Sequence, residues 1–147
     1  MSKVESVLYK FKNDLDCAQA ILSTYGPELG LDSEIAIKLT EAFTGGIGRM
    51  GETCGAVTGA FMVLGLKYGE RGTRYQPSKK KTHSLVKEFV NRFISRNGSI
   101  VCKELLGCDI GNSEVLNSEK TKNLFKTACP KYVHNAAEII EELLEIN

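Results

Sequence analysis

Hydrophobic residues recur along this chain at alternating steps of three and four, which is the spacing of one face of an α-helix. The first stripe runs from Val4 to Tyr25, and the second begins behind Asp32 and ends at the Gly45-Gly46 pair. Further helices are predicted over about 51–67, 85–94, 99–106, 118–127 and 130–145, with loops over 69–78 and 109–118. No long segment alternates with period two, so the pattern predicts no β-sheet.

The segment over about 51–67 is apolar nearly all round, whereas the other predicted helices have a single apolar face. A helix of that kind belongs in the interior of a domain. With 147 residues, the chain can bury a core without disulfide bonds. The sequence therefore predicts an all-α fold, a single domain over 1–147. We expect a bundle of about six to seven helices around a buried, glycine-containing central helix.

The composition is that of an ordinary globular protein, with 42% hydrophobic residues, 25% charged residues and a formal net charge of +1. So small a net charge argues against nucleic acid as a partner. The N-terminal segment lacks the features of a secretion signal, and an apolar run of about 13 residues is too short to span a membrane. We therefore expect a cytoplasmic protein with reduced thiols. Five cysteines, an odd number, cannot all pair within one chain.

Two glycine patterns lie at the start of the central helix. Residues 46–51 read GIGRMG and match the GxGxxG fingerprint, but a dinucleotide site needs a strand before it and this segment follows a helical pattern. We therefore expect no dinucleotide cofactor, and instead a turn at which backbones approach closely. Gly55 and Gly59 leave one face of the central helix bare. Either another helix or a bound cofactor would cover that face, so both glycines are candidate cofactor-binding residues.

Three cysteines are predicted at helix starts. Cys54 follows the glycine turn, Cys102 falls in the first turn behind Ser99, and Cys129 precedes Pro130, which favours the first helical position. The positive end of the helix dipole stabilises a thiolate at such positions.

Cys17 is predicted in the middle of a helix, where Asp14 and Asp16 disfavour its thiolate, so a metal ligand or a disulfide partner suits it better. With Arg49 nearby, Cys54 is expected to react with iodoacetamide faster than Cys17. Any free cysteine can equally be a small buried hydrophobe. The chain has no C-x-x-C pair and no C-x-x-C-H motif, which argues against a thioredoxin motif, a zinc ribbon and c-type haem.

Four segments occur in order: DCAQA around Cys17, GGIGRMGETCGAVTGA around Cys54, CKELLG from Cys102, and the Cys129-Pro130 pair. In this order they resemble the C-GCAxxG-C-C family of redox proteins, from Cys17 to Val133. The resemblance implies that these are the family's four cysteines and that Cys108 is extra. Selenocysteine in some relatives implies redox chemistry. The similarity extends to split-Soret cytochromes, which hold haem and an iron–sulfur centre, but no haem is expected here because the attachment motif is missing.

These observations predict a small redox protein, a candidate oxidoreductase, in which Cys17, Cys54, Cys102 and Cys129 converge. Two mechanisms stay open. In one, the four cysteines are catalytic: the Cys54 thiolate attacks a disulfide or an oxidant, and a second cysteine resolves the intermediate. In the other, the same four thiolates ligate an iron–sulfur cluster or another soft metal.

The expected partner is a redox protein or a small oxidant, and the bare glycine face also suits a homodimer. The rival class is a non-catalytic helical interaction or dimerisation module, in which the cysteines are free and buried. Metal analysis and a visible spectrum of anaerobically purified protein would separate these interpretations.

Overall fold

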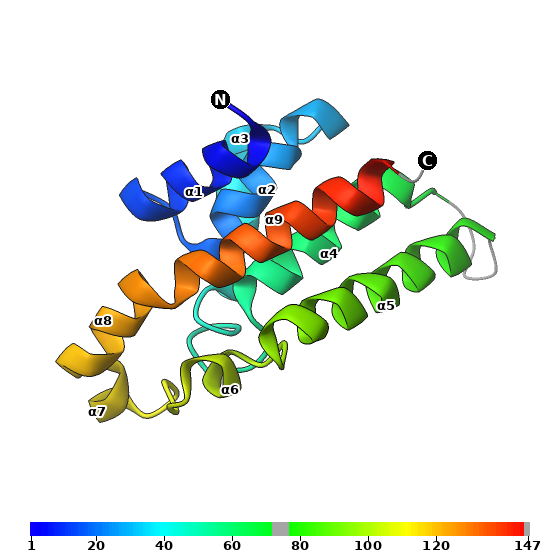
Figure 1. Ribbon diagram of the computed structural model, residues 1–147. Coiled ribbons are helices and arrows are strands. Elements are labelled where there is room, and N and C mark those ends of the chain that lie inside the picture. Colours follow the sequence, from blue (N-terminus) through cyan, green and yellow to red (C-terminus); the bar gives the residue numbers. More distant parts are fainter. Residues whose placement is uncertain (72–76, 146–147) are drawn as a thin grey trace.

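Figure 1 shows the computed structural model of the protein, in which residues 1–71 and 77–145 are described. Its α-helices are α1 (Lys3–Asn13), α2 (Cys17–Tyr25), α3 (Ser33–Thr40), α4 (Gly55–Tyr68), α5 (Pro77–Asn97), α6 (Cys102–Leu106), α7 (Ser113–Leu116), α8 (Glu119–Thr127) and α9 (Cys129–Glu145), with 3₁₀ helices η1 (Pro27–Leu29) and η2 (Glu41–Phe43). An isolated bridge joins Thr53 to Val101. The all-α prediction is confirmed. Residues 72–76 of the predicted loop lie outside the described residues.

α4 is the central helix, as its apolar sequence predicts. Ala56, Val57 and Ala60 are completely buried, and the helix packs against α2, α5 and α9. In Figure 1 α9 runs across α4, and α5 lies alongside both. Large side chains from the neighbouring helices complete this core, among them Tyr25 of α2 and Phe89 of α5.

α1 and α2 replace the single helix predicted over 4–25. α1 ends at Asn13, and α2 begins at Cys17 behind its N-cap residue Asp16. The Asp16 N–H donates to the side-chain oxygen of Gln19 (3.1 Å), which is one of the two contacts of a capping box. The periodic stripe conceals the break because both helices bury their apolar faces in the same core. As a consequence Cys17 stands at a helix start and not in mid-helix.

Two other helix starts differ from the sequence prediction. α4 begins at Gly55 and not at about 51, so Cys54 is its N-cap residue. α6 begins at Cys102 behind Val101, because the Ser99 hydroxyl accepts from the Val101 N–H (2.9 Å) without capping the helix. In both cases a local hydrogen-bonded turn takes up the residues that the pattern assigned to the first helical turn.

The C-terminal half consists of short helices followed by α9. α7 forms inside the segment 109–118 that the sequence predicts as a loop, because the Asn112 side chain accepts from the first N–H groups of the helix. α9 begins at Cys129 itself. Among the helices of residues 1–71 and 77–145, none combines the length and the apolar character that crossing a bilayer requires.

Candidate cysteine site

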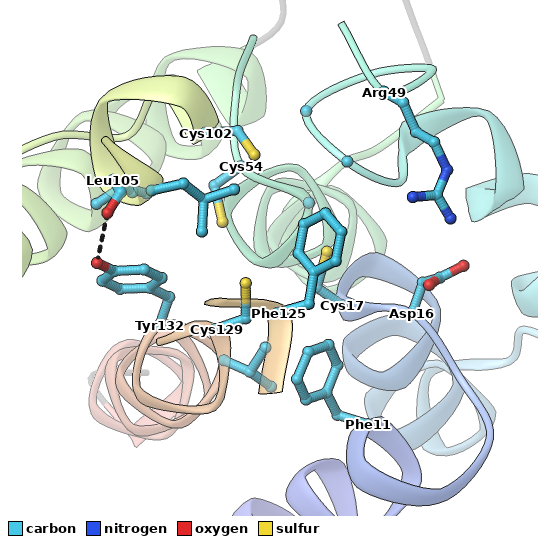
Figure 2. Close-up of a pocket in the computed structure, with 15 residues that line it drawn as sticks. Phe11, Asp16, Cys17, Arg49, Cys54, Cys102, Leu105, Phe125, Cys129 and Tyr132 are labelled. Atoms are coloured by element: carbon cyan, nitrogen blue, oxygen red, sulfur yellow. Dashed lines mark hydrogen bonds between the residues drawn. The ribbon is translucent and has the colours of Figure 1, made fainter. Parts of the chain in front are cut away.

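The four cysteines of the sequence motif line one cavity of about 110 Å³. Each stands at the start of a helix: Cys17, Cys102 and Cys129 are the first residues of α2, α6 and α9, and Cys54 is the N-cap of α4. Figure 2 shows their sulfur atoms gathered around the same space. Four helix starts therefore bring together thiols that are distant in sequence.

Apolar side chains enclose most of the cavity. They include Phe11 of α1, Leu105 of α6 and Phe125 of α8. Tyr132 of α9 adds a hydroxyl, which donates to the Leu105 carbonyl oxygen (2.8 Å, dashed in Figure 2) and ties α9 to α6 beside the thiols. The sequence pattern did not distinguish these aromatic residues from ordinary core residues. The one available signal was the place of Tyr132, about one helical turn after Cys129.

The glycine-rich turn before α4 forms another wall of the cavity. Its residues 45–49 all have left-handed backbone conformations, with φ between 58° and 70°. Glycine adopts such values freely, whereas at Ile47 and Arg49 each costs on the order of 1 kcal/mol. The Glu52 N–H closes the turn by donating to the Gly46 carbonyl oxygen (2.8 Å). The helical segments α3 and η2 precede it, so it differs from the strand-to-helix turn of a dinucleotide site.

Backbone hydrogen bonds join this turn to α6 and hold two of the thiols together. The Cys102 N–H donates to the Glu52 carbonyl oxygen (2.6 Å), and the Cys54 N–H donates to the Ile100 carbonyl oxygen (2.8 Å). Gly46 makes the approach possible, because a Cβ atom there would lie 2.7 Å from the Cβ of Cys102. The turn therefore fixes Cys54 and Cys102 relative to each other.

The two glycines of the central helix allow α2 to lie directly against α4. A Cβ atom on Gly55 would collide with the Cys17 sulfur, and one on Gly59 would lie 3.1 Å from the Cβ of Ile21 and 3.2 Å from the Ala18 carbonyl oxygen. Gly55 also lines the cavity, whereas Gly59 is not among its lining residues. Both glycines thus serve close helix packing, and their cofactor-binding role stays a prediction.

Burial dominates the acid–base properties of the thiols. It raises the pKa of Cys54 well above its ordinary value, and repulsion from a Cys17 thiolate raises it further. Burial also raises the pKa of Cys102 and of Cys129 to about 12, with the charge of Cys17 as the next cause for both. In the reduced protein without a bound cation, these thiols are therefore protonated at neutral pH.

Several backbone amides lower the pKa of Cys17, and the N–H of Ala56 does the same for Cys54. Burial is the largest influence and raises the pKa of Cys17. The N–H of Ala18 lowers this pKa, the charge of Asp16 raises it as the sequence predicts, and the N–H of Gly45 lowers it. The low pKa predicted for the three cysteines at helix starts, Cys54, Cys102 and Cys129, is wrong, because desolvation outweighs the helix dipole at each of them. Cys17 keeps partial exposure as a residue, although its sulfur is surrounded by protein atoms. The relative labelling rates of Cys54 and Cys17 stay a prediction.

Cys108, the extra cysteine, lies outside the cavity. It is partly exposed, and its sulfur is 3.8 Å from the hydroxyl oxygen of Thr121. It packs against the small hydrophobic cluster that contains Leu106 and Ile110. This position makes Cys108 a natural reference thiol within the same molecule.

The chemistry of the donor set suits a soft metal, since thiolates are the ligands preferred by Cu(I), zinc and iron–sulfur clusters. As the side chains stand, no group of three or more His, Cys, Asp or Glu residues within the two described ranges is arranged to hold a metal ion. The chemical nature of the four sulfur donors therefore fits a soft-metal centre. In their present positions, the side chains do not form a coordination site for a single ion.

The fold and the cavity define an all-α protein whose four cysteines converge from four helix starts on one site. A family model described as "Putative redox-active protein (C_GCAxxG_C_C)" matches residues 15–143. The chain belongs to this family, as the order of its cysteine segments indicates. No curated protein and no solved structure matches it.

Proposed function

We propose that the protein is an electron-transfer protein in which Cys17, Cys54, Cys102 and Cys129 ligate a redox-active iron–sulfur or other soft-metal centre. The observation that carries this proposal is the convergence of four thiols on one largely apolar cavity. Membership of a family described as redox-active supports the redox part of it.

The electrostatics of the cavity favour a cation over free thiolates. Burial is the main cause of the raised pKa at each of the four cysteines, and at Cys54 the other three thiolates raise it further. A positive ion among the sulfurs would remove both penalties, because it replaces the lost solvation and screens the repulsion. Soft metals bind thiolates strongly, so metal binding would displace the thiol protons.

The helix starts would support such a centre. The N–H groups of Ala18 and Gly45 reach the Cys17 sulfur, and the N–H of Ala56 reaches the sulfur of Cys54. Amide hydrogen bonds to ligating sulfurs tune the reduction potential of a metal centre. When bound, the centre would supply one-electron transfer, while the apolar wall around Phe11 and Phe125 would limit access of water.

The test is metal analysis of protein purified without oxygen, together with its visible spectrum. We expect stoichiometric iron and sulfide, or another soft metal, and loss of the metal in Cys17→Ser, Cys54→Ser, Cys102→Ser and Cys129→Ser. Cys108→Ser is the matched control, because this thiol lies outside the cavity, and it should retain the metal. Protein that binds no redox-active metal after anaerobic reconstitution with iron and sulfide, or with copper, would refute the proposal, because a zinc ion cannot transfer electrons.

A second candidate, thiol–disulfide exchange, is favoured by the contact between Cys17 and the neighbour of Cys54. The Cys17 sulfur lies directly against Gly55, so Cys17 and Cys54 form the best candidate pair. Their oxidation to one disulfide would reduce a substrate disulfide to two thiols, a balanced two-electron exchange. Peptide mapping after oxidation of the metal-free protein with glutathione disulfide would reveal a Cys17–Cys54 bond if this candidate is correct.

A further inference from the structure

Arg49 has a strained backbone conformation that its packing does not explain. Arg49 and Ile47 are the non-glycine residues with positive φ in the described chain, at 60° and 65°. The Ile47 side chain is half-buried, so packing accounts for its place. Arg49 is exposed, and no hydrogen bond or ion pair joins its guanidinium to another residue of the ranges 1–71 and 77–145. The hydrogen bonds of the turn hold this conformation, among them the one that the Arg49 N–H donates to the Thr44 carbonyl oxygen (2.9 Å), and backbone strain at an exposed residue is a signal of function.

The left-handed conformation directs the Arg49 side chain to the cysteine cavity. Its Cγ atom lies 2.7 Å from the point where a Cβ atom on Gly45 would stand, so the absence of a side chain at Gly45 makes room for the stem of Arg49. Gly45 also supplies an N–H that reaches the Cys17 sulfur. Arg49 lines the cavity, and Figure 2 shows its guanidinium at the edge of the site, away from the sulfur atoms.

We propose that Arg49 recognises the anionic group of a small redox partner at the rim of the cysteine cavity. This inference rests on the proposed redox function and names the class of molecule that the site would serve. Among the described residues that line the cavity, Arg49 is the one cationic residue and Asp16 is the one anionic residue. A guanidinium presents a planar set of donors that matches a carboxylate, whereas the remaining wall is mostly apolar.

The position of the guanidinium fits recognition better than stabilisation of a thiolate. Arg49 lines the cavity, and Figure 2 shows that its guanidinium lies away from the four sulfur atoms. Its charge is therefore placed to meet a molecule at the rim. Because Asp16 lines the same cavity, its carboxylate should weaken the attraction for an anion, and the two residues should have opposite effects.

The test compares two alkylating reagents of similar size on reduced, metal-free protein: iodoacetate, which is anionic, and iodoacetamide, which is neutral. In both reactions the thiolate sulfur attacks the methylene carbon and iodide leaves. Mass spectrometry gives the ratio of the iodoacetate rate to the iodoacetamide rate at Cys17 and at Cys108. The measured quantity is the normalised ratio, which is the value at Cys17 divided by the value at Cys108. Any change in the thiolate fraction of Cys17 cancels in this ratio.

Arg49→Gln should lower the normalised ratio by about threefold at low ionic strength, and added salt should reduce the difference. Arg49→Lys should keep much of the ratio, because it keeps the charge. Asp16→Asn should raise the ratio and still cap α2, since asparagine is a good N-cap residue. Ile47→Gly is the matched control: it relieves the same backbone strain in the same turn without changing charge, and should leave the ratio unaltered.

Three results would overturn the inference: an unchanged ratio in Arg49→Gln, an equal fall in Ile47→Gly, or no alkylation of Cys17 by either reagent in the folded protein. The assay needs no metal, so it fails or succeeds independently of the proposed metal centre. Metal analysis would show that the proposed function is wrong, whereas the rate ratio would show that this inference is wrong.

Discussion

Gly55 and Gly65 both belong to α4, yet a side chain at the two positions would meet different surroundings. At Gly55 a Cβ atom would collide with the Cys17 sulfur, whereas at Gly65 it would have no heavy atom within 4 Å. Replacement by alanine at the two positions therefore separates the effect of helix propensity from the effect of the contact with Cys17.

Gly65→Ala should stabilise the protein by up to about 1 kcal/mol, because alanine is the better helix former. Gly55→Ala should instead destabilise it by about 1–3 kcal/mol, because overpacking forces α2 away from α4 and displaces Cys17. Urea unfolding of the reduced protein measures both. Equal effects at the two positions would show that the contact between Gly55 and Cys17 is not tight in solution.

The role of Gly55 and Gly59 was predictable only in part. Their spacing in the sequence indicated that something covers the bare face of the central helix. The identity of the covering element, α2 with Cys17 at its start, was not predictable because the break before Cys17 is concealed in a continuous apolar stripe.

Between elements, the contact of the glycine turn with α6 is set by backbone hydrogen bonds. Cys102 and Lys103 donate to the carbonyl oxygens of Glu52 and Gly51, at 2.6 and 2.9 Å. Gly46 stands at this junction with φ 70°, where a Cβ atom would lie 2.6 Å from the Glu52 nitrogen. The substitution of Gly46 by alanine, which adds a single methyl group, therefore tests the junction.

Gly46→Ala should open the junction and cost clearly more than about 1–2 kcal/mol, which is the cost of positive φ alone. Gly98→Ala is the control, because Gly98 also has positive φ (91°) but has no atom within 4 Å of its missing Cβ. Hydrogen exchange should show faster exchange of the Cys102 and Lys103 amides in Gly46→Ala only. Retained protection of these amides would contradict the role of the junction in placing Cys102.

Helix starts were the most informative and the least exact part of the sequence prediction. The cysteines were expected near helix starts at three positions, and the structure adds Cys17 as the fourth. The errors of a few residues arose where short polar contacts, such as Ser99 with Val101, compete with capping. Periodicity does not report such contacts, because they involve too few residues.

For the whole molecule, the buried thiols link stability to pH. The pKa of Cys102 and of Cys129 rises from an ordinary value of 9.0 to about 12 on folding. Between these values the unfolded chain has lost thiol protons that the folded chain still holds. The stabilisation is therefore complete below about pH 9 and is lost as pH rises towards about 12.

The reduced, metal-free protein should accordingly lose stability between about pH 9 and pH 12, as measured by urea unfolding. Cys102→Ala and Cys129→Ala should each reduce this loss relative to the starting protein, while Cys108→Ala, whose thiol lies outside the cavity, should not. Lysine titration contributes equally to all variants, so the difference between them isolates the cavity thiols. A slope that is the same in all three variants would show that these thiols are not desolvated.

The sequence by itself determined the helical class, the burial of the central helix and the four cysteine segments of the family, because periodicity and short motifs are local properties. The convergence of these segments was expected only from the family resemblance. The tertiary structure decided the cavity at which they meet and the left-handed turn that directs Arg49 towards it. It also reversed the expectation for Cys54. A helix start favours a thiolate through neighbours in sequence, whereas desolvation depends on every segment that packs around the sulfur, and at Cys54 desolvation prevails.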